Sequence, residues 1–226
     1  MNKLWKKFSL GDSFLLLLVC ITVFLVPMFP PVYHRRIYDA LFTVIVPASA
    51  FALQKNRKVI LASAFAVTFA EWVTSHLGLL IATTVSRVSV ILFFVWIVIS
   101  LVIQVASTRK VTSRVIIDSI CGYLLMGTVF TLMVALVMLL QGNAFNLPAA
   151  KPTLAHQPSP LSDYFYYTFV TFATLGYGDV VPKTHIAKAL ATLIAVVGQL
   201  YLATIVAMLI GKYASSASEE DHVSKE

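Results

Sequence analysis

Long apolar stretches alternate with short polar gaps along most of this chain of 226 residues. Because a helix rises about 1.5 Å per residue, roughly 20 apolar residues are needed to cross the hydrocarbon core of a bilayer. Six stretches approach that length: residues 10–29, 37–54, 58–77, 84–107, 113–141 and 184–212. This pattern predicts an all-α integral membrane protein with six transmembrane helices.

One segment between the fifth and sixth stretches breaks the pattern. It reads LSDYFYYTFVTFATLGYGDVVPKT and follows a polar, proline-rich linker, 141–161, which we expect to be an external loop. Ser162 or Asp163 can cap the start of a helix, and an apolar and aromatic run then extends to about Ala173. About eleven residues make a helix of roughly 17 Å, which is half the thickness of a bilayer. We therefore expect a re-entrant helix that enters the membrane and turns back.

Composition excludes an ordinary soluble domain, because 59% of the residues are hydrophobic and only 12% are charged. The net charge of +7 does not indicate a nucleic-acid partner, since most Lys and Arg residues lie in the short gaps between apolar stretches and report topology. With both termini in the cytoplasm, eleven of the 17 basic residues lie on the inner side, although HRR at 34–36 does not fit. We expect a multi-pass protein with this orientation.

The sequence TLGYGD at 174–179 is expected to line a polar path. Non-helical backbone at membrane depth is tolerated only where protein buries it or where it lines water. Gly176 and Gly178 reach positive φ angles without a Cβ penalty, so alternating residues can turn successive carbonyl groups toward one axis. The oxygen ligands for a dehydrated cation would be the hydroxyl of Thr174 and the carbonyls of Thr174, Leu175, Gly176 and Tyr177. Because one copy supplies one wall, four chains are needed to enclose the path.

This segment resembles the selectivity filter and pore helix of the potassium channel family. The resemblance covers about residues 113–212 and is carried by TLGYGD after YFYYTFVTFA. Leu175 stands where the family usually has Val or Ile, whereas Tyr177 keeps a residue that related non-selective channels often replace. Gly198 lies twenty residues after Gly178, which matches the hinge glycine of the family's inner helix. The stretch VVGQLYLATIVAMLIG looks like the inner helix of bacterial six-span members.

The resemblance implies a homotetrameric potassium-selective channel in the lipid bilayer of the cell membrane, with K⁺ as the permeant ion and no cofactor. Its selectivity filter would comprise Thr174, Leu175, Gly176, Tyr177, Gly178 and Asp179. Residues 109–213 would form the pore domain, residues 1–108 a four-helix bundle and residues 214–226 a short cytoplasmic tail. Two alternatives stay open: a weakly selective cation channel, and a transporter or receptor with a re-entrant binding loop.

Asp179 needs a partner that differs from the one in some bacterial relatives. In those proteins a Glu six residues before the first filter glycine bonds to this aspartate, and here that position is Val170. We expect Tyr166, with Tyr167 and Val170 beside it, to support the filter, and the hydroxyl group of Tyr166 to hold Asp179. The alternative is that Tyr164, Tyr166 and Tyr167 belong to an interfacial aromatic belt.

The last apolar stretch contains the candidate gate. Gly198 is either a bending hinge or a close-packing site, and Leu202, Val206 and Ile210 could line a cavity or form a hydrophobic gate. The fourth stretch has one basic residue, Arg87, whereas a voltage sensor needs several, so we expect no steep voltage gating. No nucleophile with a base, carboxylate pair or metal cluster stands out in the sequence, so we expect no enzyme activity.

Overall fold

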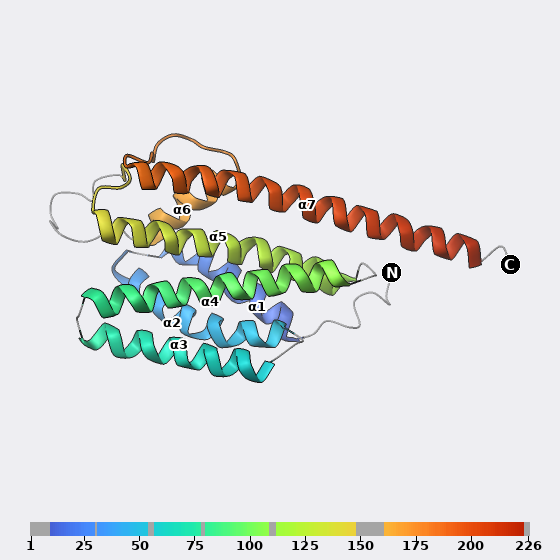
Figure 1. The fold of residues 1–226 in the computed structure, drawn as a ribbon, viewed down its shortest axis with the longest axis horizontal. Coiled ribbons are helices and arrows are strands. Elements are labelled where there is room, and N and C mark those ends of the chain that lie inside the picture. The colour runs from blue at the N-terminus through green and yellow to red at the C-terminus, as the bar shows by residue number, and fades with distance from the viewer. Residues whose placement is uncertain are drawn as a thin grey trace.

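A computed structural model describes residues 10–29, 31–53, 57–77, 80–108, 112–147 and 161–223. This part of the chain is helical nearly throughout, as Figure 1 shows, which confirms the all-α prediction. The helix α1 (Leu10–Cys20) continues as a π-helical turn (Ile21–Leu25) and a 3₁₀ turn (Val26–Met28). The remaining helices are α2 (Pro31–Ala52), α3 (Arg57–Leu77), α4 (Leu80–Ser107), α5 (Ser113–Gln141), α6 (Leu161–Phe172) and α7 (His185–Val223).

Three helices within the described residues are long and apolar enough to cross a membrane: Thr84–Ser107, Ser113–Gln141 and His185–Tyr213. Two shorter apolar helical stretches, Phe14–Met28 and Ile37–Ser49, precede them in the chain. The protein is therefore an all-helical, multi-pass membrane protein.

The helices α1 to α4, which we call the peripheral bundle, lie along one side of α5 (Figure 1). Their buried side chains join those of α5 and α6 in one apolar core, which includes Leu15 of α1, Phe94 of α4 and Leu125 of α5. All three of these side chains are fully buried. Buried side chains of α4 and α5 share this core, so these two helices pack side by side. Within one chain, the peripheral bundle thus rests on that chain's own α5.

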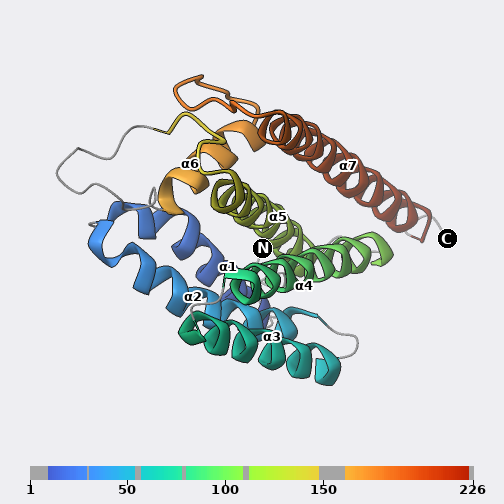
Figure 2. The same ribbon diagram turned by 60° about the vertical axis from the view of Figure 1, so that its left-hand side comes forward.

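The short helix α6 lies close to both α5 and the peripheral bundle (Figure 2). The ring of Phe165 in α6 stacks on the ring of Tyr38 in α2, with 5.4 Å between the centroids. Both side chains are almost completely buried. The peripheral bundle therefore contacts α6 directly as well as through α5.

Several helix boundaries differ from the sequence prediction, and those of α2 and α7 have a physical reason. The helix α2 begins at Pro31 rather than at residue 37, and proline is well tolerated at a first helical position because it has no N–H group to lose there. The helix α7 continues past residue 212 to Val223, so residues 214–223 of the predicted tail 214–226 are helical. No proline or glycine follows Gly211 to stop it.

Candidate functional site

The helix α6 has twelve residues and is therefore about 18 Å long, which is close to the predicted length and to half the thickness of a bilayer. It packs closely on α5 because Gly127 has no side chain: a Cβ atom there would collide with the ring of Phe169. The buried residues of α6 are Tyr164, Phe165, Tyr167, Thr168 and Phe172. The loop that follows α6 therefore starts from a firmly packed helix.

The chain leaves α6 in a tight turn centred on one backbone carbonyl group. The carbonyl of Val170 accepts hydrogen bonds from the amides of Leu175, at 2.9 Å, and Gly176, at 3.2 Å. The amide of Thr174 donates to the carbonyl of Thr171 at 3.0 Å. Val170 thus contacts the loop through its backbone carbonyl. We had considered only the side chain at position 170 and did not predict this contact.

Positive φ angles occur at alternate residues of the loop: 61° at Thr174, 55° at Gly176 and 81° at Gly178. The two glycines adopt the conformation that the sequence led us to expect. Thr174 does not follow from the sequence, because a β-branched residue pays a steric penalty in this region, of order 1–3 kcal/mol. Among the described residues, Thr174 is the one non-glycine with such an angle. Strain of this kind concentrates at functional sites.

Residues 173–179 are exposed along their whole length in the single chain. The side chain of Leu175 is 61% exposed and that of Tyr177 is 67% exposed. Exposed backbone and large apolar side chains together indicate a surface that something outside the single chain covers.

The hydrogen bond that we expected between Tyr166 and Asp179 is present, with 2.6 Å between the hydroxyl oxygen and Oδ2. The other carboxylate oxygen, Oδ1, accepts from the amide of Val180 at 3.0 Å. Because the tyrosine hydroxyl stabilises the carboxylate, it holds the pKa of Asp179 below its usual value. Asp179 is therefore a fixed negative charge at the end of the loop.

The other two tyrosines of α6 have a different role. Tyr164 and Tyr167 are buried within the chain, and the ring of Tyr167 packs on Phe145 with 4.8 Å between centroids. The aromatic-belt alternative therefore does not describe these two residues, which belong to the apolar core around α5 and α6.

The segment after the loop is tied to the end of α5. Two backbone hydrogen bonds of 2.8 Å join residues 144–146 to residues 181–183. The hydroxyl of Thr184 donates to Oε1 of Gln141 at 2.6 Å and accepts from the amide of Ala187 at 3.2 Å, which caps the start of α7. We did not predict this frame, although a threonine just before an apolar run is a signal for a helix cap.

Gly198 lies directly under the end of α6. A Cβ atom at this position would overlap the carbonyl oxygen of Phe172. The close-packing alternative therefore has a direct structural basis, whereas α7 runs through residue 198 as one helix and bending there stays a prediction.

The candidate gate residues lie on the uncovered face of α7. Leu202, Val206 and Ile210 are exposed, while Tyr201 and Ile205 are buried against the rest of the chain. Gln199 is exposed as well and begins the same stripe, three, seven and eleven residues before these three. We did not single out Gln199 from the sequence, although a polar side chain within an apolar span is by itself a signal of a water-lined surface.

Comparison with known proteins assigns these elements to a class. Residues 119–214 match the family model described as "Ion channel". This segment is similar to the pore of ion channels, and we call residues 119–214 the pore domain after that similarity. It contains most of α5, all of α6, the loop with alternating φ angles and α7 as far as residue 214. The match covers less than half of the chain, and the matched family is one of ion channels and not of enzymes, as the sequence led us to expect.

The pore domain is also similar to the A-type voltage-gated potassium channel KCND3. The sequences from Rattus norvegicus, Oryctolagus cuniculus and Homo sapiens are each 35% identical to it over 66 residues. The match covers 29% of this chain and 10% of the length of each relative. The similarity is therefore distant and limited to the pore region of those proteins.

Proposed function

We propose that the chain forms a potassium-selective channel in the cell membrane, with four copies around one pore. The observation that carries this proposal is the alternation of positive φ angles at Thr174, Gly176 and Gly178, in an exposed loop behind a half-membrane helix. Such a backbone can turn successive carbonyl oxygens to one side, and rings of these oxygens replace the hydration shell of K⁺. The similarity to relatives named as potassium channels supports the choice of ion.

In this proposal the filter comprises residues 174–179 of each copy. K⁺ is bound by the backbone carbonyls of Thr174, Leu175, Gly176 and Tyr177. Asp179 lies at the external mouth, where Tyr166 holds it in its charged form. The C-terminal end of α6 carries partial negative charge and favours a cation over an anion.

The rest of the chain is assigned by the same proposal. Residues 109–213 form the pore unit, residues 1–108 a peripheral unit of four spans and residues 214–226 a short cytoplasmic extension. Six spans place both termini in the cytoplasm. Steep voltage dependence is not expected, since α4 contains Arg87 as its one basic residue.

The test is flux through purified protein reconstituted into liposomes under a KCl gradient. We expect a reversal potential near the K⁺ equilibrium value and little change when Na⁺ is added. A reversal potential near zero in mixed salts would indicate a weakly selective cation channel, and flux that saturates at carrier rates would indicate a transporter. Either result would contradict the proposal.

A pair of glycine variants tests the filter itself. Gly176→Ala places a side chain on a residue with a φ of 55°, so we expect K⁺ flux to be lost. Gly211→Ala is the matched control, because a Cβ atom there meets nothing within 4 Å and the residue has no positive φ angle. K⁺ flux at the wild-type level in both variants would rule out residue 176 as part of the filter.

A further inference from the structure

Three helices meet at the end of the molecule where α4 ends and α5 begins. Val105 of α4, Val115 of α5, and Tyr201 and Ile205 of α7 form a small buried apolar cluster. The hydroxyl of Tyr201 donates a hydrogen bond to the carbonyl of Ser119 in α5 at 2.7 Å. One face of α7 is therefore attached to α5 in this region.

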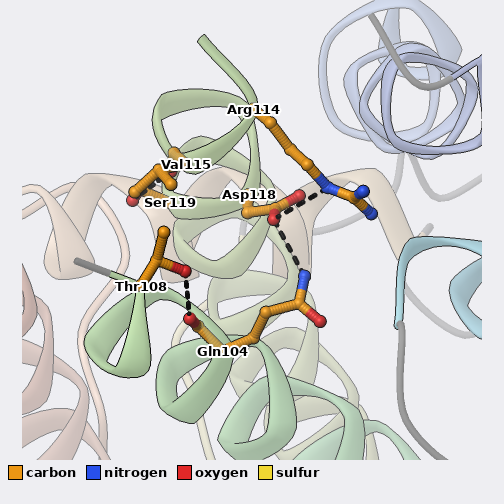
Figure 3. Close-up of polar contacts among 6 residues, drawn as sticks. All are labelled: Gln104, Thr108, Arg114, Val115, Asp118 and Ser119. Carbon is orange, nitrogen blue, oxygen red and sulfur yellow. Dashed lines mark hydrogen bonds and ion pairs between the residues drawn. The ribbon is translucent and has the colours of Figure 1, made fainter. Parts of the chain in front are cut away.

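A polar network ties α4 to α5 at the same end (Figure 3). Nε2 of Gln104 in α4 donates to Oδ2 of Asp118 in α5 at 2.9 Å, and Nε of Arg114 lies 3.8 Å from the same oxygen. Asp118 is only 3% exposed. Because leaving a buried carboxylate without its partners is costly, these contacts favour movement of α4 and α5 as one unit.

Lys212 connects α7 to the end of α4. Its ammonium group donates hydrogen bonds to the carbonyls of Val105, at 2.8 Å, and Ala106, at 2.9 Å. The last carbonyls of a helix have no partner inside the helix and carry partial negative charge, so a lysine ammonium group is a favourable partner for them. The contact joins residues more than 100 positions apart in the sequence.

This contact lies on the opposite side of α7 from the candidate gate. Ile210 precedes Lys212 by two residues, which is about 200° of rotation around a helix. Val206 precedes it by six residues, about 240° after full turns are removed. Both residues are exposed, so in a four-fold pore they would face the axis or a neighbouring copy. A contact that holds Lys212 on α4 thus draws the candidate gate away from the axis.

We propose that Lys212 is a latch, which holds the inner helix α7 on α4 of the same chain and so keeps the gate at Val206 and Ile210 open. The proposal rests on the proposed function, because a gate requires a pore. Lys212 is a positioning residue and does not contact the ion. Because Lys212 joins the two helices, a displacement of α4 moves α7 and so changes the gate. The position of the peripheral bundle thus controls the gate without a charged sensor helix.

The test uses single-channel recording of the full chain in planar bilayers. Lys212→Met keeps the length of the side chain and removes its donors, whereas Lys212→Arg keeps donors. Lys58→Met, at the exposed start of α3, is a matched control for the loss of one positive charge. We expect the open probability to fall at least about threefold in Lys212→Met, on the strength of a charged hydrogen bond, while unitary conductance and reversal potential stay unchanged. Lys212→Arg and Lys58→Met should behave like the wild type.

An unchanged open probability in Lys212→Met would overturn the latch and leave the potassium pore intact. A wild type that conducts without selecting K⁺ would instead overturn the proposed function. A measurement that needs no conduction separates the two further. Spin labels at Tyr213→Cys, with Cys20 and Cys121 replaced by Ala, should lie closer together across the tetramer in Lys212→Met than in Lys212→Arg. Equal distances in the two variants would also overturn the latch.

Discussion

The helices α5 and α7 are both long enough to cross a membrane, but the chain covers them very differently. In its most apolar stretch α5 is 44% buried, whereas α7 is only 22% buried. The difference arises because α5 lies among the peripheral bundle, α6 and α7, while α7 is attached along one face. Contacts within the chain therefore cover α5 on several sides, whereas one face of α7 is left for other molecules to cover.

The exposed surface consists of the apolar face of α7 and the backbone of the loop, and these two parts differ in what can cover them. Lipid can cover the apolar side chains of α7, because hydrocarbon is as apolar as they are. The amides of residues 173–176 bond within the chain, but lipid cannot hydrogen-bond to the exposed carbonyl groups of residues 173–179, and a polar group left without a partner in hydrocarbon costs several kcal/mol. The loop therefore gives a stronger reason than α7 for association with further copies.

The largest effect is expected where the peripheral bundle meets α6. Phe165→Ala removes a buried ring that stacks on Tyr38 at 5.4 Å and on Phe169 at 6.2 Å. The resulting cavity should cost about 3–5 kcal/mol of folding stability. Thermal unfolding of the purified protein measures it. The control is Phe65→Ala on α3, whose ring is 75% exposed and should matter little. Equal losses of folding stability in both variants would show that burial within the chain does not decide how much a side chain stabilises the protein.

A smaller effect is expected at Gly198, where the uncovered helix touches the covered one. In Gly198→Ala the added methyl group presses on the carbonyl of Phe172, which should cost about 1–3 kcal/mol and displace the end of α6. We expect a lower K⁺ over Na⁺ permeability ratio in the liposome assay. If Gly198 acts as a hinge instead, the same variant should alter the open probability and leave selectivity as it was.

The sequence predicted the features whose signals are local. The bounds of α5 match the predicted stretch 113–141, and α6 was recognisable as an apolar run too short to cross a bilayer, although it begins at Leu161, ahead of the two residues that we expected to cap it. The φ angle of Thr174 was not predictable, since threonine disfavours it and the surrounding hydrogen bonds impose it. The contact of Lys212 with α4 depends on how distant helices pack, which no periodicity in either helix encodes. For Gly198, the spacing from Gly178 predicted where the glycine lies. It did not predict the contact with Phe172, which supports a close-packing role.

The smallest effect is expected at the outer end of the loop, at the hydrogen bond between Tyr166 and Asp179. This bond lowers the pKa of Asp179, so its contribution is complete above the ordinary aspartate pKa and is lost as the external pH falls through the lowered pKa. Tyr166→Phe keeps the ring and removes the donor. The pKa of Asp179 should then rise, and K⁺ current should decline at a higher pH than in the wild type, with faster inactivation.

Recordings over a series of acidic external pH values measure this shift. Tyr33→Phe is the control, because Tyr33 is an exposed tyrosine on α2, far from Asp179 in sequence and outside the pore domain. An unchanged pH midpoint and inactivation rate in Tyr166→Phe would mean that the amide of Val180, 3.0 Å from Oδ1, is sufficient to hold Asp179. The uncovered half of the pore domain would then be fixed at its outer end by backbone alone, and the side chains of the covered helix α6 would contribute nothing there.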